Sequence, residues 1–540
     1  MSMEAFLHNL HYDTDKTKPP DTVVDWEDRP LAYKLYRGLP VVPLSPEVVL
    51  TLEGVEAPAK PNLRGVGDFL WYVFGLTQLC QSVSAFNSTE QTMGMMQSNR
   101  RFVPSGGALY PNELYVYLKV EDLPAGMYHY DVAHHRLVLL REGNYDSYLT
   151  CAIGNRCDVS SCFGTVFVST MFWKNFFKYN NFAYRLQGLD AGALIGQLLE
   201  VAKRFGFTTG VCFQFLDQAV NHLLGISEQE ESVYAVIPLS VESRISWFGN
   251  SDGSDNRVRM VSATELCREL ALIKHSHYVR SRRVKEFPML IKMNEASRLD
   301  FLPPITEIGK GLANWDEREE AEKQEKQEGQ VVKLPQVSRL SYDLALVSRK
   351  RFSPDKDFLL AKVSQVQLAI LLQEATASFL YRNDLDGPTG KPEPRVALYG
   401  CLYNVEGIPD GAYFYDSEAH ALRRLRHGDQ RLSLHQAMSS DNINIFQVPL
   451  CLHVAGDRNQ RREALGYRGY RIQQMEAGML VQRLLLAASA IGMGGHPLLG
   501  FNAQLCDDIY SMTSQGITSL IQIPVGPYRH CPRLEGGLHG

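Results

Sequence analysis

The chain has 540 residues, of which 45% are hydrophobic and 10% aromatic, and this is enough apolar material for more than one packed core. A formal net charge of -5 and an isoelectric point near 6.3 exclude nucleic acid and an anionic membrane as expected main partners, because the overall field attracts neither. No apolar run approaches about 18 residues and no apolar secretion signal opens the chain, so a cytoplasmic location is expected.

The ten cysteines are scattered and contain no CxxC pair or ligand-like pairing with histidine. This pattern predicts reduced thiols, with neither a disulfide framework nor a metal site.

The N-terminal residues, 1–60, are rich in proline and aromatics without a clear period, and are expected to wrap a folded body. The segment 66–79 then has apolar residues at helical spacing, whereas 113–120 alternates like a strand.

A loop of small residues lies between these two segments, in RFVPSGGALYPNELYVY at 101–117. Ser105, Gly106 and Gly107 have little or no side chain, so their backbone N–H groups can lie against a flat or anionic ligand. Most glycine-rich turns only reverse the chain, and the loop by itself leaves both readings open.

Further along, 184–205 is apolar at helical spacing and 232–240 is strand-like. Ser262 and Glu265 have capping-box spacing at the start of 262–285, whose basic end is interpreted as the solvated end of a helix. The highly charged stretch 316–330 is expected to be a linker or an isolated exposed helix.

Sliding the chain over itself shows an internal repeat across that linker. GMYHYDVAHHRL at 126–137 matches GAYFYDSEAHAL at 411–422, and YRLQGLDAG at 184–192 matches YRIQQMEAG at 470–478. The offset between matching blocks is 285 or 286. VIPLS ending at residue 240 and QIPVG ending at residue 526 match at the same offset of 286. The repeat predicts two copies of one α+β unit, arranged like a former homodimer within one chain.

The two copies have diverged. The loop at 104–107 corresponds to Thr-Gly-Lys-Pro at 389–392, and Lys178 and Tyr179 correspond to Ala464 and Leu465. Copy two instead has SRKRFSP at 348–354, GMGGHPLLGF at 492–501 and PVGPYR at 524–529, where arginines suit a phosphate and glycines suit a ring. Each copy is therefore expected to supply part of one composite site.

The motifs PSGGALYPNELYVY, LPAGMYHYD, KYNNFAYRLQGLDAG and EAGMLVQRLLLAASAIGMGG resemble the nitroreductase superfamily, and within it the azoline dehydrogenases of the SagB/ThcOx type. The resemblance covers nearly the whole chain except the charged linker. It implies an α+β, tandem duplicated nitroreductase-like fold that forms an intrachain pseudo-dimer. The expected domains are the extension 1–60, copy one at 61–260, a connector at 261–340 and copy two at 341–540.

The resemblance also implies an FMN-dependent oxidase that converts thiazoline or oxazoline rings in a peptide or peptide-like biosynthetic intermediate to thiazole or oxazole. One FMN per chain is expected between the copies. The expected FMN contacts are Arg101, Pro104, Ser105, Gly106, Gly107, Arg349, Arg351, Gln482, Gly494, Gly495 and Arg529. SRKRFSP departs from the usual Arg-Arg-Ser-x-Arg spacing, which leaves open which of Arg349, Lys350 and Arg351 contacts the phosphate.

Lys178 and Tyr179 match a catalytic Lys-Tyr pair of the azoline dehydrogenases. Aromatisation removes a hydride and a proton from the ring, so a base must lie near the ring carbon. We expect Tyr179 to be this base and the Lys178 ammonium to favour its phenolate, while the reverse assignment stays open. Asp190 and Glu476, at equivalent helix positions, are explained equally well as structural charges.

Two other functions remain open: a general NAD(P)H-dependent nitro or quinone reductase, and a non-catalytic peptide-binding scaffold. The expected partners are a peptide or peptide-like substrate and a cyclodehydratase or assembly-line protein. The sequence leaves open whether the chain is a monomeric pseudo-dimer or a homodimer.

Overall fold

The computed structural model describes residues 1–19, 23–48, 50–52, 61–84, 94–242, 247–248, 261–303, 331–387, 392, 394–530 and 536–537. The charged linker at 316–330 and most of the copy-two segment 389–392 lie outside the described residues.

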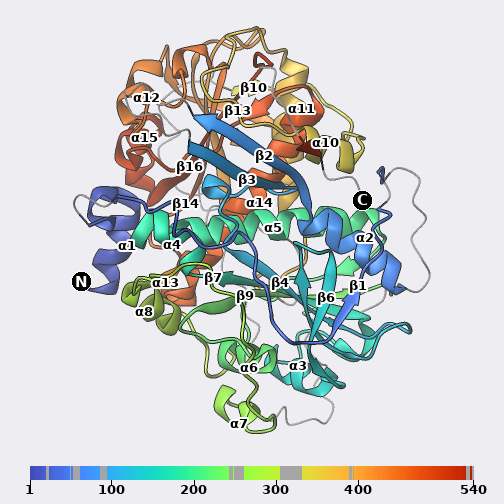
Figure 1. Cartoon of the computed structure of the whole chain (residues 1–540). Helices are drawn as coiled ribbons and strands as arrows, with labels where there is room; N and C mark the ends of the chain where they lie inside the picture. Colours follow the sequence, from blue (N-terminus) through green and yellow to red (C-terminus); the bar gives the residue numbers. More distant parts are fainter. Residues whose placement is uncertain are drawn as a thin grey trace.

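Two seven-stranded antiparallel sheets with the same strand order form the two halves of the molecule (Figure 1). The order in copy one is β1 (Val41–Pro43), β6 (Arg136–Glu142), β5 (Gly126–Asp131), β4 (Asn112–Leu118), β7 (Gly164–Met171), β9 (Glu231–Ser240) and β8 (Thr208–Thr209). The order in copy two is β10 (Val331–Lys333), β13 (Ala421–His427), β12 (Gly411–Asp416), β11 (Val396–Leu402), β14 (Leu450–Asp457), β16 (Ile517–Gly526) and β15 (Gly494–Gly495). The predicted α+β tandem duplication is confirmed.

Two long buried helices, α5 (Ala183–Arg204) and α14 (Arg468–Ala490), pack against each other between the sheets. In Figure 1, α5 runs across the middle of the molecule. A Cβ atom on Gly192 would lie 2.0 Å from the Met475 carbonyl oxygen, and one on Gly478 would lie 2.1 Å from that of Leu189. These contacts are related by the repeat offset of 286, so both copies need glycine where their helices cross.

The shorter helices pack either against the two long central helices or against the strands and one another. In copy one and the connector they are α2 (Leu63–Phe74), α3 (Asp146–Ala152), α4 (Trp173–Tyr179), α6 (Asp217–Leu224), α7 (Ala263–Cys267) and α8 (Pro288–Ala296). In copy two they are α10 (Leu344–Lys350), α11 (Gln365–Thr376), α12 (Arg431–Ala437), α13 (Arg462–Leu465) and α15 (Ala503–Tyr510).

Most elements lie where the sequence places them. The helix predicted at 184–205 is α5, and the strands predicted at 113–120 and 232–240 are β4 and β9. The helix predicted through residue 79 ends at Phe74, because Gly75 follows and a strand begins at Leu76.

The interpretation of 262–285 as one helix is wrong beyond its start. Ser262 and Glu265 do form a capping box, but α7 ends at Cys267. The basic residues lie in extended chain, where the backbone amides of Arg282 and Arg283 donate to the Asp28 carboxylate at 2.6 and 2.9 Å. Asp28 therefore holds this segment against the N-terminal residues, which sequence periodicity does not reveal.

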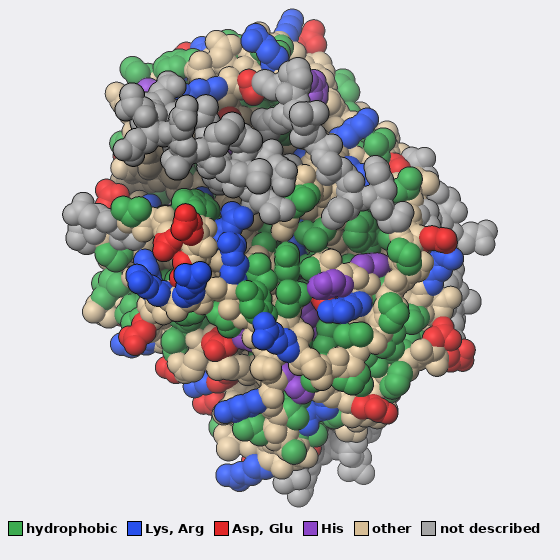
Figure 2. Space-filling model, viewed as in Figure 1, with side chains coloured by type: hydrophobic (Ala, Val, Ile, Leu, Met, Phe, Trp, Pro, Cys, Tyr) green, Lys and Arg blue, Asp and Glu red, His purple; other side chains and the backbone are tan. Residues whose placement is uncertain are grey.

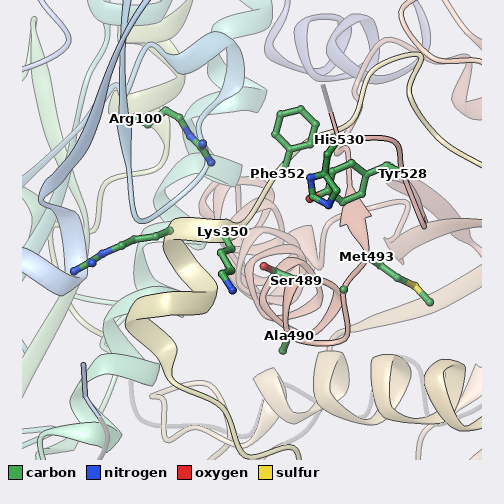
Figure 3. Close-up of a pocket in the computed structure, with 10 residues that line it drawn as sticks. Arg100, Lys350, Phe352, Ser489, Ala490, Met493, Tyr528 and His530 are labelled. Atoms are coloured by element: carbon green, nitrogen blue, oxygen red, sulfur yellow. The ribbon is translucent and has the colours of Figure 1, made fainter. Parts of the chain in front are cut away.

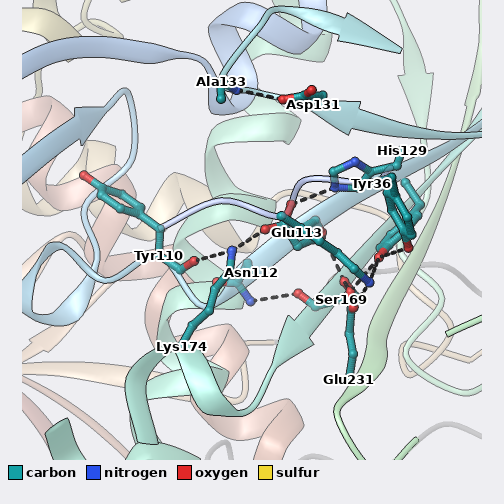
Figure 4. Close-up of polar contacts among 12 residues, drawn as sticks. Tyr36, Tyr110, Asn112, Glu113, His129, Asp131, Ala133, Ser169, Lys174 and Glu231 are labelled. Carbon is teal, nitrogen blue, oxygen red and sulfur yellow. Dashed lines mark hydrogen bonds and ion pairs between the residues drawn. The ribbon is translucent and has the colours of Figure 1, made fainter. Parts of the chain in front are cut away.

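The N-terminal residues contact both copies. In helix α1 (Met3–Tyr12), His11 Nε2 lies 2.8 Å from Thr518 Oγ1 of copy two. Lys34 is buried in copy one, where its Nζ lies 2.7 Å from the Glu231 carboxylate. Figure 4 shows this buried polar network, which continues through Glu113 to Lys174. The extension is thus held by buried charges as well as by apolar packing.

A hairpin of β2 (Leu76–Ser84) and β3 (Gly94–Arg101) extends from copy one into the half formed by copy two (Figure 1). It pairs with β17 (Gly536–Gly537) in a third sheet. At its base the Arg100 guanidinium donates a hydrogen bond to the Arg351 carbonyl oxygen of copy two. The hairpin therefore brings residues of both copies together.

Basic and acidic side chains are interspersed on the face shown in Figure 2, in keeping with the small net charge. Among the described residues, we find no helix with the length and apolar character needed to cross a membrane.

The helix crossing gives a direct test of the duplicated architecture. Replacing Gly192 with alanine should lower the free energy of unfolding by more than about 2 kcal/mol, because the methyl group would overlap a backbone oxygen. Gly500→Ala is the control, since its Cβ would lie 3.7 Å from the nearest atom, Ser439 Cβ. Denaturant unfolding measures both, and a Gly192→Ala protein as stable as the wild type would contradict the packing.

Candidate active site

A cavity of about 730 Å³ lies between the copies, within the size range of ligand pockets. Arg100 of copy one lines it together with residues of copy two. These come from α10, the end of α14 and the chain after β16: Arg349, Lys350, Phe352, Ser489, Ala490, Gly492, Met493, Tyr528 and His530. In Figure 3, Phe352, Tyr528 and His530 gather on one side, and Arg100 and Lys350 lie on the other. The site is therefore composite.

The cavity wall is cationic. Arg100, Arg349 and Lys350 line it, and none of its described lining residues is acidic. Arg351 lies between two lining residues, is 5% exposed, and its Nε has no hydrogen-bond partner among the described residues. Burial, followed by the charge of Arg100, lowers the pKa of Arg351 to about 10. A bound anion would compensate this charge.

The other walls suit a flat ring. Phe352 and Tyr528 stack with ring centroids 5.2 Å apart and planes at 29°. The Gly492 turn has φ of +78°, and a Cβ there would meet no atom within 4 Å, so the backbone is open toward the cavity. Cationic and aromatic walls therefore face the same space.

Several residues expected at the cofactor lie elsewhere. The Arg101 guanidinium packs 3.9 Å from the Phe74 ring centroid and donates to the Ala32 carbonyl oxygen. Gln482 donates to Gln197 of α5 at 2.7 Å. Arg529 is exposed, while its neighbours Tyr528 and His530 line the cavity.

Gly494 and Gly495, which were expected to contact the flavin ring, are closely packed against other residues of the protein. A Cβ on Gly494 would lie 2.4 Å from Pro354, and one on Gly495 would lie 2.6 Å from Leu485. Their small size is thus required by protein packing, whereas Gly492 is the glycine that lines the cavity. Sequence reasoning missed Arg100, Phe352, Gly492, Tyr528 and His530. Three of these, Arg100, Tyr528 and His530, are direct sequence neighbours of Arg101 and Arg529. Because side chains alternate in direction along an extended chain, these neighbours could have been considered.

The small-residue loop lies against the predicted catalytic pair. A Cβ on Gly107, whose φ is +65°, would lie 2.6 Å from the Tyr179 hydroxyl oxygen and 3.0 Å from Lys178 Nζ. The loop is held by Asp190 of α5, which accepts hydrogen bonds from Ser105 Oγ at 2.6 Å and the Gly106 amide at 3.1 Å. Glycine is thus required for the approach of the pair to the backbone.

Burial and nearby charges shift the pKa values of both members of the pair. Burial, followed by the charge of Asp190, raises the pKa of Tyr179 to about 12. Burial, followed by the charge of Lys18, lowers the pKa of Lys178. Lys178 Nζ also lies 4.8 Å from the Tyr179 ring centroid, over the ring face. Burial therefore disfavours the charged form of both side chains, the Tyr179 phenolate and the Lys178 ammonium.

Tyr110 connects the loop with the cationic wall. Its amide donates to Ser105 Oγ at 2.9 Å, and the charges of Arg101 and then Arg351 oppose the rise that burial causes in its pKa. Tyr110 thus lies between the small-residue loop and the two buried arginines Arg101 and Arg351.

The equivalent turn of copy one also has an exposed glycine with positive φ, Gly206. Gly206 and Phe207 correspond to Gly492 and Met493 at the offset of 286, and the Phe207 ring packs 4.8 Å from Phe163 and 5.4 Å from Phe69. The two turns therefore share their backbone form, and Phe207 and Met493, which follow the glycines, are both buried.

Comparison with known proteins establishes the family. The sequence pattern of the Nitroreductase family matches residues 84–239 and 356–526, which together are more than half of the chain. The chain belongs to the nitroreductase family, as its motifs predict, and this membership indicates an oxidoreductase. Proteins of this family generally bind FMN.

Two relatives are similar over part of the chain. "Putative nitroreductase MJ1384" of Methanocaldococcus jannaschii is 22% identical over 30% of this chain and 80% of its own length. "Trifolitoxin-processing protein TfxB" of Rhizobium leguminosarum bv. trifolii is 29% identical over 29% of this chain, and the match spans 44% of that protein.

One solved structure matches the whole architecture. A protein of Anabaena variabilis described as a putative nitroreductase has a TM-score of 0.70 at 20% identity, covering 98% of this chain and 99% of that one. This similarity supports the two-copy fold.

Arg351 offers a test of the cavity as a flavin site. Because its buried charge lacks an acidic partner among the described residues, Arg351→Met should leave the flavin-free protein as stable as the wild type or more stable, while FMN retention falls at least tenfold. Flavin absorbance and thermal unfolding measure the two effects.

Arg529→Ala distinguishes this geometry from the motif-based expectation. The exposed position of Arg529 predicts that FMN is retained. Loss of FMN in Arg529→Ala but not in Arg351→Met would contradict our assignment of the cationic wall.

Proposed function

We propose that this protein is an FMN-dependent oxidoreductase that oxidises thiazoline or oxazoline rings in a peptide or peptide-like intermediate to thiazole or oxazole. The observation that carries the proposal is the closure of the small-residue loop onto Lys178 and Tyr179. A buried amine with a lowered pKa is the kind of group that ring aromatisation needs and that simple electron relay does not.

The cavity fits FMN in three respects. Arg100, Arg349 and Lys350 line the cavity and would hold the phosphate, with the buried Arg351 beside them. Phe352 and Tyr528 offer flat apolar surface, and Gly492 leaves the backbone open. When bound, FMN supplies a two-electron acceptor for the hydride that leaves the ring.

In this proposal Lys178 accepts the proton that leaves the ring. The neutral Lys178 amine takes the proton from the ring carbon at Nζ and becomes an ammonium. The Trp26 ring lies 5.2 Å from this Nζ and the Tyr179 ring 4.8 Å from it, so two aromatic faces receive the new charge. Tyr179, kept as a phenol, orients the amine and covers it from water.

One relative supports a role in processing a biosynthetic product. The name of TfxB records the processing of trifolitoxin, and that protein shares 29% identity with this chain over 166 residues. A cyclodehydratase or assembly-line partner would supply the azoline substrate in this proposal.

Lys178 is the residue to test first. Lys178→Met should lower kcat for azoline oxidation by about 10²-fold to 10⁴-fold while FMN remains bound, because the base is removed outside the cofactor cavity. Tyr179→Phe keeps the ring beside the amine, so its kcat should fall less than that of Lys178→Met. In the wild type the rate should rise with pH up to the lowered pKa of Lys178, as the neutral amine forms.

Rapid bleaching of the flavin by NADPH, with no reaction on azoline peptides, would instead favour a nitro or quinone reductase. A colourless protein that cannot be reconstituted with FMN would favour a binding scaffold. Activity that is unchanged in Lys178→Met would contradict the assigned base.

A further inference from the structure

Asp190 is a buried carboxylate beside the catalytic pair that the mechanism above does not use. It is 8% exposed, and its two oxygens accept hydrogen bonds from Ser105 Oγ and the Gly106 amide. Within the described part of the chain, Asp190 forms no ion pair with a lysine or arginine. The loop is thus tied to α5 by a carboxylate whose charge has no opposite charge paired with it.

Copy two shows that the fold itself does not need this arrangement. Glu476 occupies the equivalent position on α14, and its carboxylate accepts a hydrogen bond from Arg395 Nε at 2.6 Å. A second carboxylate, that of Asp386, also binds Arg395. The same helix position is therefore neutralised in the copy that has Ala464 and Leu465 instead of the catalytic pair.

The charged and titratable groups around Asp190 come from three sides. Lys178 and Tyr179 of α4 lie against Gly107, next to the hydrogen-bonded Gly106. Tyr110 donates through its amide to Ser105, and the Arg101 guanidinium lies 4.7 Å from its ring centroid. On α14, which packs along α5, Glu476 is paired with Arg395. None of these cations pairs with Asp190.

We propose that Asp190 is a positioning residue that clamps the loop at 104–107 against Lys178 and Tyr179, and that protonation of its carboxylate weakens this clamp. Hydrogen bonds to a carboxylate are about twice as strong as those to a neutral acceptor, so the ionised form holds Ser105 and Gly106 more firmly. The link to catalysis rests on the proposed function, whereas the clamp rests only on the geometry of the loop.

The direction of the pH dependence follows from the surroundings. Burial raises the pKa of Asp190 to about 7, and the hydrogen bonds from Ser105 and Gly106 oppose this rise. The clamp is therefore strong above about pH 7 and weak below it. The ordinary pKa of an aspartate is 3.8, so the folded protein binds a proton at Asp190 more tightly than the unfolded chain does. The contribution of Asp190 to the free energy of unfolding therefore falls as the pH rises from 3.8 to about 7.

The experiment follows the carboxylic acid C=O band of Asp190 by infrared spectroscopy as a function of pH, in flavin-free and FMN-loaded protein. The wild type should lose one such band near pH 7, and Asp190→Asn should lack it. Ser105→Ala should move the transition to higher pH, because the hydroxyl that favours the carboxylate is gone. Glu476→Gln is the matched control and should keep the wild-type transition.

Hydrogen exchange and turnover complete the test. Asp190→Ala should lose exchange protection at the Gly106 amide, while Asp190→Asn, which keeps an acceptor oxygen, should retain part of it. Asp190→Asn should also lower kcat about tenfold or more with little change in KM, and should remove the limb of the pH profile near pH 7.

A transition near pH 7 that persists in Asp190→Asn, or that does not move in Ser105→Ala, would overturn the clamp. An absence of turnover in the wild type, with the infrared and exchange results as expected, would refute the proposed reaction and leave the clamp supported. Turnover that is lost in Lys178→Met but unchanged in Asp190→Asn would support the reaction and overturn the positioning role.

Discussion

The close crossing of α5 and α14 is the contact on which the rest of the structure depends. Gly192 and Gly478 let each helix touch the backbone of the other, at positions related by the repeat. Because the helices meet at this distance, the copies share buried ion pairs such as Arg468 with Asp217. Arg100, at the base of the copy-one hairpin, lies beside residues of α10 and the end of α14 that line the cavity. The duplicated core thus creates the boundary at which a composite site can form.

The two copies use the same framework for different purposes. Copy one keeps the small-residue loop, the Lys178–Tyr179 pair and an Asp190 that has no lysine or arginine ion pair among the described residues, whereas copy two pairs Glu476 with Arg395. Copy two supplies Arg349, Lys350 and the Gly492 turn to the cavity, whereas copy one supplies Arg100. A symmetric framework with an asymmetric distribution of charge explains how one site per chain would replace the two of a homodimer.

The sequence predicts the framework well, because its signals are periodic or repeated. The offset of 286 predicts both the paired helices and the repeated sheets, and the motifs predict the family. The direction of an individual side chain is harder to predict from sequence, because successive residues of an extended chain point to opposite faces. Arg100 therefore lines the cavity where Arg101 was expected, and Tyr528 and His530 do so beside Arg529. The pKa values of the pair also depend on burial and on the charges of Lys18 and Asp190, which follow from the tertiary structure.

The most direct test of this account is the number of FMN molecules bound per chain, measured by flavin release and protein quantification after full reconstitution. One FMN per chain is the result that a single composite site predicts. Two FMN per chain would contradict the asymmetry between the copies, and no FMN would contradict the assignment of the cavity itself.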